Sequence, residues 1–332
     1  MPTIHSGEFD FKNVPEGTPF QLIHGGAGPE DPKGSEAFAS HEALLKVLNT
    51  PFGGFASSYP QVKRPTSSTA ALCLQQASIL EAEPLFNAGF GAALQFDRIA
   101  RVSASYMDNL SQKFSAIINL TSFAHPSFLA HYLQSQRFCV LDAMGAQSLF
   151  EDLNLIQQNL VVPHRLAQWE KKRSQGLDPQ KQNCIVKNPI LPGKIEGKST
   201  IGSIVAEASG AIAVCTSTGG VGYEVVGRVG DTPTVAGNFC NAHTAISCTG
   251  YGEQILAEGF AVKVTTRVSD GKTLRDAVAL SLAEAHQRNF DFACIAAHFN
   301  PQTKTLHWVA GSLAEFFVWG TNANNGKTFL KI

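Results

Sequence analysis

The stretch TIGSIVAEASGAIAVCTST, residues 200–218, is the segment of this 332-residue chain that decides its fold. It is apolar and rich in β-branched residues, and Ser209 and Gly210 mark a turn near its centre. β-Branched runs on both sides of a turn predict a hairpin. Because both faces of each run are apolar, we expect two mostly buried strands, the first of which begins at Thr200.

The sequence immediately upstream has a different texture. Residues 167–199, AQWEKKRSQGLDPQKQNCIVKNPILPGKIEGKS, are polar, contain three prolines and show neither helical nor strand periodicity. These features predict a long exposed linker. A polar tether that runs directly into a buried strand beginning with Thr is a first indication of function, although a plain domain linker would show the same pattern.

The rest of the chain combines buried strands with helices. Strands that are apolar on both faces need a covering layer on each side, so the architecture we expect is a sandwich of sheets covered by helices. Periodicity and turn signals predict these elements: strands at 18–28, 92–107, 292–299 and 305–310, and helices at 35–48, 67–83 and 273–287.

Composition and charge narrow the classes of function. The chain is 44% hydrophobic and 16% charged, which is typical of a globular protein with a large core. Its net charge of -1 offers no basic field for nucleic acid or an anionic membrane. Neither a secretory signal nor a run of about 18 apolar residues is visible. We expect a soluble, cytoplasmic protein with a small-molecule substrate and no nucleic-acid or membrane partner.

Cysteine and histidine show no metal-binding pattern. The seven cysteines are scattered without a CxxC pair, which favours reduced thiols packed in the core. None of the ten histidines lies in an HExxH spacing, and His24 is expected to be structural. The sequence therefore predicts no transition metal and no cofactor for the chemistry.

Three short blocks dense in Gly, Ser and Thr follow Thr200. They are TSTGG at 216–220, GRVGDTP at 227–233 and TGYGE at 249–253. Glycine lets a backbone N–H approach a ligand closely, and nearby hydroxyls can orient a nucleophile. Each block alone is most often a turn, but the three together, directly after a buried strand that starts with Thr, indicate a site.

With these blocks the sequence resembles the plant-type asparaginases and isoaspartyl peptidases, a family of N-terminal nucleophile hydrolases. The resemblance covers roughly residues 19–260 and weakens in the last seventy or so. It also includes HGGAG at 24–28, LEAEPLFNAG at 80–89, Met107-Asp108 and Thr200-Ile201-Gly202.

The resemblance implies an α/β (α+β) fold, a four-layer αββα sandwich, formed as one domain by residues 1–332. Self-cleavage between Ser199 and Thr200 would divide it into an α fragment, 1–199, and a β fragment, 200–332, and the cleaved units would pair as a homodimer. The implied activity is hydrolysis of the side-chain amide of L-asparagine, of β-aspartyl (isoaspartyl) dipeptides, or of both.

The chemistry of an N-terminal Thr agrees with this family. Once cleaved, Thr200 would carry both a hydroxyl nucleophile and a primary amine that can take its proton. An α-amino group has a pKa of about 7.7–8.0 and is partly neutral near pH 7. Before cleavage that nitrogen is an amide, so the precursor is expected to be inactive. By resemblance, Thr218 poises the Thr200 hydroxyl, while Thr249 and the Gly250 N–H stabilise the oxyanion.

A substrate clamp and a sodium site are also implied by the resemblance. Arg228 would take the α-carboxylate with its planar fork, Asp231 the α-ammonium, and Gly252 would add a backbone contact. In the family, backbone carbonyls wrap a structural sodium ion; the matching residues here are Leu80, Glu81, Glu83, Phe86, Ala88 and Phe90.

The sequence departs from the family at two positions. Ser199 stands where Gly is usual, which predicts slow or incomplete cleavage because Gly reaches strained conformations more easily. Asn109 replaces the Gly of MDG. Ser199 also supports an alternative, an uncleaved and silent homologue that acts as a binding protein. Relatives of the glycosylasparaginase or taspase type are less well supported, because TSTGG replaces TSTNG and Asp231 is present.

Overall fold

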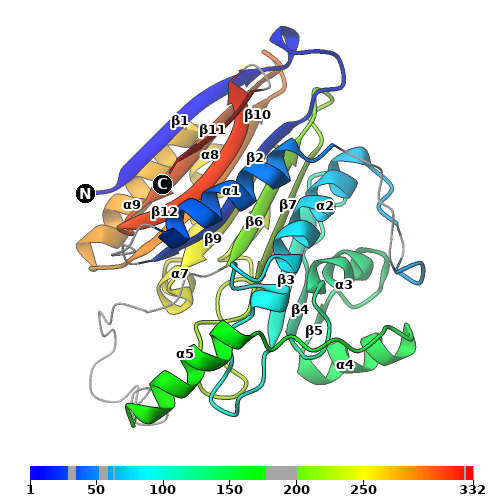
Figure 1. Ribbon diagram of the computed structural model, residues 1–332. Coiled ribbons are helices and arrows are strands. Elements are labelled where there is room, and N and C mark those ends of the chain that lie inside the picture. Colours follow the sequence, from blue (N-terminus) through cyan, green and yellow to red (C-terminus); the bar gives the residue numbers. More distant parts are fainter. Residues whose placement is uncertain (29–34, 52–58, 63, 177–199, 325–326, 332) are drawn as a thin grey trace.

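The computed structural model describes residues 1–28, 35–51, 59–62, 64–176, 200–324 and 327–331, and it contains two β-sheets that face each other (Figure 1). The five-stranded sheet has the order β1-β11-β10-β9-β8, with β1 Thr3–Asp10, β8 Asn238–Cys240, β9 Thr244–Gly250, β10 Phe292–Asn300 and β11 Thr305–Ser312.

The eight-stranded sheet has the order β13-β12-β2-β6-β7-β3-β4-β5. Its strands are β2 Phe20–Gly28, β3 Val102–Asp108, β4 Ser115–Leu120, β5 Val140–Leu141, β6 Ile201–Ala206, β7 Ile212–Thr218, β12 Phe316–Asn324 and β13 Lys327–Lys331.

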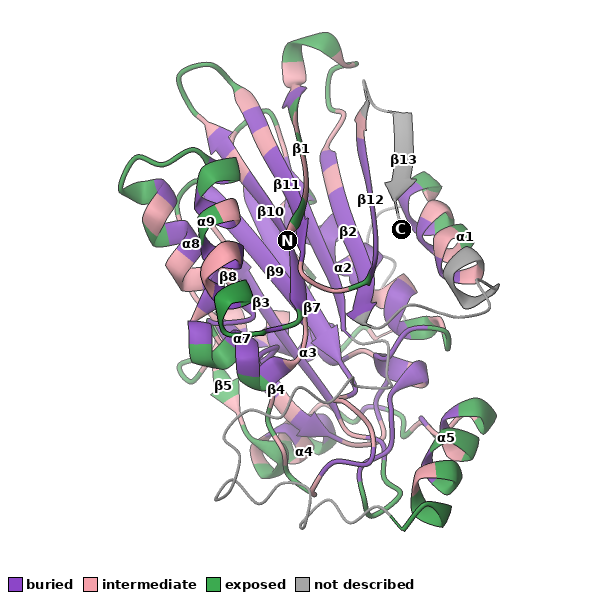
Figure 2. Ribbon diagram, turned by 90° about the vertical axis from the view of Figure 1, so that its left-hand side faces the viewer, coloured by how far each residue is buried: buried purple, intermediate pink, exposed green. Residues whose placement is uncertain are grey.

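Helices cover the outer face of each sheet. On the eight-stranded sheet, α1 packs on β12, α2 on β6 and β7, and α3 on β3 and β4; on the five-stranded sheet, α8 packs on β9 and α9 on β11 (Figures 1 and 2). The helix bounds are α1 Ser35–Asn49, α2 Ser68–Ala82, α3 Pro126–Tyr132, α4 Ala143–Asp152, α5 Pro163–Ser174, α7 Gly252–Glu258, α8 Phe260–Ser269 and α9 Leu274–Gln287.

Three apolar cores separate these layers. One lies between α1 to α4 and the eight-stranded sheet, the second between the two sheets, and the third between the five-stranded sheet and the α8–α9 pair. Burial on both faces explains why the central strands are apolar throughout. The expected four-layer αββα sandwich is confirmed. Among the described residues, no helix has the length and apolar character needed to cross a bilayer.

The hairpin that begins at Thr200 forms as the sequence predicts. Every residue of β6 and β7 is buried, and the two strands pair in register from Ile201 with Ser217 to Ala206 with Ile212. Gly210 in the connecting turn has φ +88, a conformation that glycine adopts without a steric penalty. The hairpin occupies the middle of the eight-stranded sheet, and Thr200 immediately precedes its first strand.

Two predictions about local structure are wrong. The linker predicted at 167–199 begins too early, because α5 continues to Ser174 and buries Trp169; the remainder, 177–199, lies outside the described residues and includes Ser199. Of the strand predicted at 92–107, only the part from Val102 onward is a strand, and the preceding residues form a loop with one isolated bridge.

Candidate active site

Thr200 and Thr218 meet at the end of the central hairpin. The Thr200 hydroxyl donates a hydrogen bond of 3.1 Å to Oγ1 of Thr218, and both residues are buried. The register explains this, because Ile201 pairs with Ser217 and the residue before one therefore faces the residue after the other. Oγ1 of Thr218 also accepts the N–H of Gly220 at 3.2 Å, which fixes its orientation.

The backbone of Thr200 is strained. Its φ is +45, in the left-handed region that a β-branched residue rarely adopts. A residue held in such a conformation costs about 1–3 kcal/mol and persists only where its surroundings impose it. Strain was expected at Ser199, which lies outside the described residues; the strained backbone that the structure describes is that of the neighbouring Thr200.

Thr249 and Gly250 reach the same region from the facing sheet. The Asn109 side chain donates to the carbonyls of Gly210, before β7, and Ala242, before β9, so both strands start at the same end of the sandwich. Halfway along, Oγ1 of Thr216 lies 2.7 Å from Oγ of Ser247. The two strands therefore run side by side in the same direction and end together at Thr218 and Thr249.

Gly250 is required by its surroundings. Its φ is +134, and a Cβ at this position would lie 2.6 Å from the Cα of Phe292 on the neighbouring strand. Only glycine avoids both the strain and the clash. Thr249 beside it is fully buried. A hydroxyl and a backbone N–H thus stand next to each other at the end of β9, as an oxyanion hole requires.

Arg228, Asp231 and Gly252 also converge. A Cβ on Gly252 would lie 2.8 Å from Oδ1 of Asp231 and 2.9 Å from Nη2 of Arg228, so the acid and the guanidinium both lie beside this glycine, and a side chain there would clash with both. Asp231 is only 5% exposed, and its Oδ2 has no hydrogen-bond partner among the described residues. Burial raises the pKa of Asp231 to about 7, against the opposing charge of Arg228.

Glu253 is a residue whose role the sequence analysis missed. Its carboxylate accepts two hydrogen bonds of 2.7 Å from Nε and Nη2 of Arg228. Burial acts to raise the pKa of Glu253, but the Arg228 hydrogen bonds and charge hold it below the ordinary value. The TGYGE block contains this acid, but nothing in the block indicates that it pairs with an Arg 25 residues earlier.

His24 is fully buried in the layer between the sheets. Its Nε2 lies 2.9 Å from Oγ of Ser247, which in turn contacts Thr216, and Thr216 donates to Asn238 at 2.8 Å. Burial lowers the pKa of His24 to about 3, so the ring is neutral at physiological pH. This agrees with a structural role. The sequence analysis assigned no role to Ser247 or Asn238.

Gly89 in the Leu80–Phe90 segment and Gly91 just after it pack against carbonyl oxygens. α2 ends at Ala82, two residues before Pro84, which cannot continue a helix. A Cβ on Gly89 would clash with the carbonyl oxygen of Glu81, and one on Gly91 with that of Phe86. These close contacts explain why both positions are glycine.

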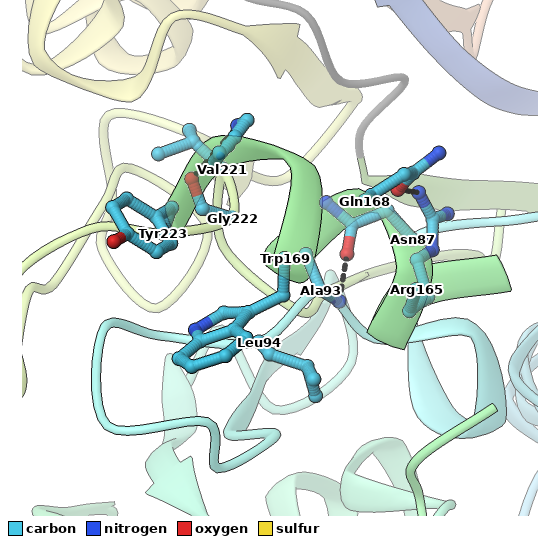
Figure 3. A pocket seen from close by; sticks show the side chains of 10 residues that line it. Asn87, Ala93, Leu94, Arg165, Gln168, Trp169, Val221, Gly222 and Tyr223 are labelled. Carbon is cyan, nitrogen blue, oxygen red and sulfur yellow. Dashed lines mark hydrogen bonds between the residues drawn. The ribbon is translucent and has the colours of Figure 1, made fainter. Parts of the chain in front are cut away.

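A small hollow lies behind the loop that follows Thr218, against α5 (Figure 3). Its volume of about 20 Å³ has room for roughly one water, so it is not a substrate pocket. Asn87 on its wall donates to the carbonyl of Gly220 at 2.6 Å and accepts from the N–H of Ala93 at 2.8 Å. Trp169 and Lys172 of α5 donate to the carbonyls of Gln95 and Gly222. α5 thus braces the loop that holds Thr218.

Metal-ligating side chains do not gather anywhere in the part of the chain that the structure describes. The six cysteines within it are all free. The site consists of hydroxyls, glycine backbone, one arginine and carboxylates, a set suited to acyl transfer.

Comparison with known proteins identifies the family. The asparaginase family profile matches residues 18–306. The isoaspartyl peptidase/L-asparaginase of Synechocystis sp. is 37% identical over 279 residues, which cover 84% of this chain and 82% of the relative. That of Nostoc sp. is 35% identical over 282 residues, 85% of this chain and 86% of the relative. The human protein of the same name is 28% identical over 316 residues, 93% of this chain and 94% of the relative. This chain therefore belongs to the asparaginase family.

Proposed function

We propose that this protein is a self-cleaving amidohydrolase whose nucleophile is the hydroxyl of Thr200. The observation that carries the proposal is the buried hydrogen bond of 3.1 Å between the hydroxyls of Thr200 and Thr218, on a backbone with φ +45. A poised hydroxyl and a strained peptide on the same residue suit both of the reactions required, the cleavage of the chain and the hydrolysis of substrate.

In the cleavage step, Oγ1 of Thr200 attacks the carbonyl carbon of Ser199. The C–N bond to Thr200 breaks, an ester to the Thr200 oxygen forms, and the amide nitrogen gains the proton that the hydroxyl loses. Water then hydrolyses the ester, which leaves a carboxylate on Ser199 and a free amine on Thr200. Strain at Thr200 is relieved when the amide opens, which lowers the barrier to this step.

In the hydrolytic reaction, the Thr200 amine takes the hydroxyl proton while the oxygen attacks the side-chain carbonyl of the substrate. Thr249 and the Gly250 N–H stabilise the oxyanion, and loss of one such donor costs about 100- to 1,000-fold in rate. The leaving amine departs with a proton from the Thr200 ammonium. Water then attacks the acyl-enzyme and releases the aspartyl product.

The substrate class follows from Arg228 and Asp231. A guanidinium and a carboxylate that both lie beside Gly252 suit the α-carboxylate and α-ammonium of one amino acid. The relatives are named for L-asparagine and isoaspartyl peptides, and both substrates present this zwitterion next to a β-carbonyl. We propose that one or both are substrates here.

Three further properties are part of the proposal. The carbonyls of the Leu80–Phe90 segment would hold a structural sodium ion, which keeps that loop in shape and takes no part in the chemistry. The cleaved units would pair as a homodimer. The six free cysteines of the described residues support a reducing compartment such as the cytoplasm.

A denaturing gel together with amino-terminal sequencing tests the proposal. Self-cleavage yields fragments of residues 1–199 and 200–332, and the smaller one begins TIGSI. Ammonia release from L-asparagine, and release of the second amino acid from a β-aspartyl dipeptide, measure the hydrolysis. An intact chain that releases neither product would instead support the silent homologue, for which Ser199 is the argument.

A further inference from the structure

The guanidinium of Arg228 is held on one edge only. An arginine can bind a carboxylate through its side edge, Nε with Nη2, or through its end edge, Nη1 with Nη2. Glu253 occupies the side edge with two hydrogen bonds of 2.7 Å. Within the described residues, Nη1 makes no hydrogen bond, so the end edge is available to a ligand.

The available edge faces glycine backbone. A Cβ on Gly230 would lie 3.2 Å from Nη1 and 3.3 Å from Nη2 of Arg228, and one on Gly252 would lie 2.9 Å from Nη2. The same Gly252 position lies 2.8 Å from Oδ1 of Asp231. The end edge of the arginine and the buried carboxylate therefore border one small space, and neither glycine fills it.

The rest of Arg228 is also fixed in place. Its N–H donates to the carbonyl of Val225 at 3.1 Å, and its carbonyl accepts from Asn119 at 3.2 Å. Glu253 lies in the first turn of α7, three residues after Gly250. The ion pair therefore connects the direction of the guanidinium to the end of β9, where the oxyanion is stabilised.

We infer that Glu253 is a positioning residue that determines the specificity for an α-carboxylate. By occupying the side edge it turns the end edge of Arg228 toward the space beside Asp231, at a set distance from Thr249 and Gly250. A bidentate carboxylate then fits only when the β-carbonyl of the substrate lies at the nucleophile. The inference rests on the proposed function and names a determinant of substrate choice within it.

The test compares Glu253→Gln with the wild type by the KM for L-asparagine and by inhibition with 3-aminopropanamide, the L-asparagine analogue that lacks the α-carboxylate. Losing one charge-assisted hydrogen bond should raise KM for L-asparagine about tenfold and leave kcat within about twofold. The inhibition constant of 3-aminopropanamide should not change, because that ligand does not use Arg228. Glu284→Gln is the control, since the Glu284 carboxylate also accepts two hydrogen bonds from an arginine, both from Nη2 of Arg267, on the α8–α9 layer.

A double-mutant cycle separates positioning from a general effect on α7. In the Arg228→Ala background, adding Glu253→Gln should change KM less than twofold, because the group it positions is absent. Three results would each overturn the inference. The KM effects of the two substitutions could multiply in the double variant, the KM and the inhibition constant of 3-aminopropanamide could rise equally in Glu253→Gln, or the KM of Glu253→Gln could fall. A denaturing gel distinguishes failure of this inference from failure of the proposed function. If the wild-type chain stays intact and inactive, the proposed function is wrong. If the variants are cleaved and active but their KM is unchanged, only the role of Glu253 is refuted.

Discussion

The Nε2 atom of His24 lies 2.9 Å from Oγ of Ser247, and this hydrogen bond crosses the layer between the two sheets. It passes over the Cα of Gly202, where any Cβ would clash with both partners. Gly202 is two residues beyond Thr200 and pairs with His24 in the sheet. The hydrogen bond therefore joins β2, which pairs with the strand that follows the nucleophile, to β9, the strand that contains Thr249.

Removing the Ser247 hydroxyl should weaken the fold. Ser247→Ala leaves Nε2 of His24 and one contact of Thr216 unsatisfied in a buried layer, which costs about 1–3 kcal/mol. Denaturant unfolding measures this best in the uncleaved Thr200→Ala chain, where the two fragments cannot separate. Ser209→Ala in the exposed hairpin turn is the control, and equal stability of the two variants would show that the buried bond contributes nothing.

Thr200→Ala should abolish both self-cleavage and hydrolysis, because both reactions use its hydroxyl. Thr200→Ser keeps a hydroxyl and an amine and should retain part of both activities. A gel and an ammonia assay follow the two reactions, with Thr303→Ala on the exposed turn between β10 and β11 as the control. A Thr200→Ala chain that still cuts itself at the Ser199 bond would show that another group is the nucleophile.

Arg228→Ala should spare cleavage and weaken substrate binding. The guanidinium is part of the proposed substrate clamp and takes no part in the cleavage of the Ser199–Thr200 bond. The two fragments should therefore appear at the normal rate on the gel. Loss of a charge-assisted contact predicts a rise in KM of about tenfold or more. If Arg228→Ala blocked cleavage as well, its role would be structural.

Substrate binding should depend on pH through Asp231. Burial raises its pKa to about 7, and the ionised form is the one that attracts an ammonium group. Above pH 7 the carboxylate is mostly ionised; below it, the free enzyme is mostly protonated there. KM for L-asparagine should therefore rise as pH falls, approaching about tenfold per pH unit well below the pKa.

Asp231→Asn is the matching variant for the pH experiment. Its KM should be high and nearly constant between pH 5.5 and 8, because no group that binds the ammonium titrates in that interval. The Thr200 amine also titrates near this range, at about 7.7–8.0, but it affects kcat through the base. A flat KM in the wild type would contradict the role of Asp231.

Local patterns were sufficient for the elements with the strongest periodicity. The hairpin predicted at 200–218 and the helices predicted at 67–83 and 273–287 all have their signal within a few residues, and each prediction was confirmed. The predicted linker was wrong at its start because α5 is polar on most of its surface. The helix is attached to the rest of the fold by the buried Trp169 and by a few side-chain hydrogen bonds to backbone carbonyls that are distant in the sequence.

What the sequence by itself determined is the identity of the chemical groups: a Thr at the start of a buried strand, the hydroxyl and glycine blocks, and the Arg228–Asp231 pair. Their roles in the reaction stay predictions. What only the tertiary structure decided is which groups meet. Residues of β7 and β9 come together because two sheets stack, and Glu253 meets Arg228 because a loop folds over the start of α7. Such contacts depend on packing between distant segments, which no local spacing encodes.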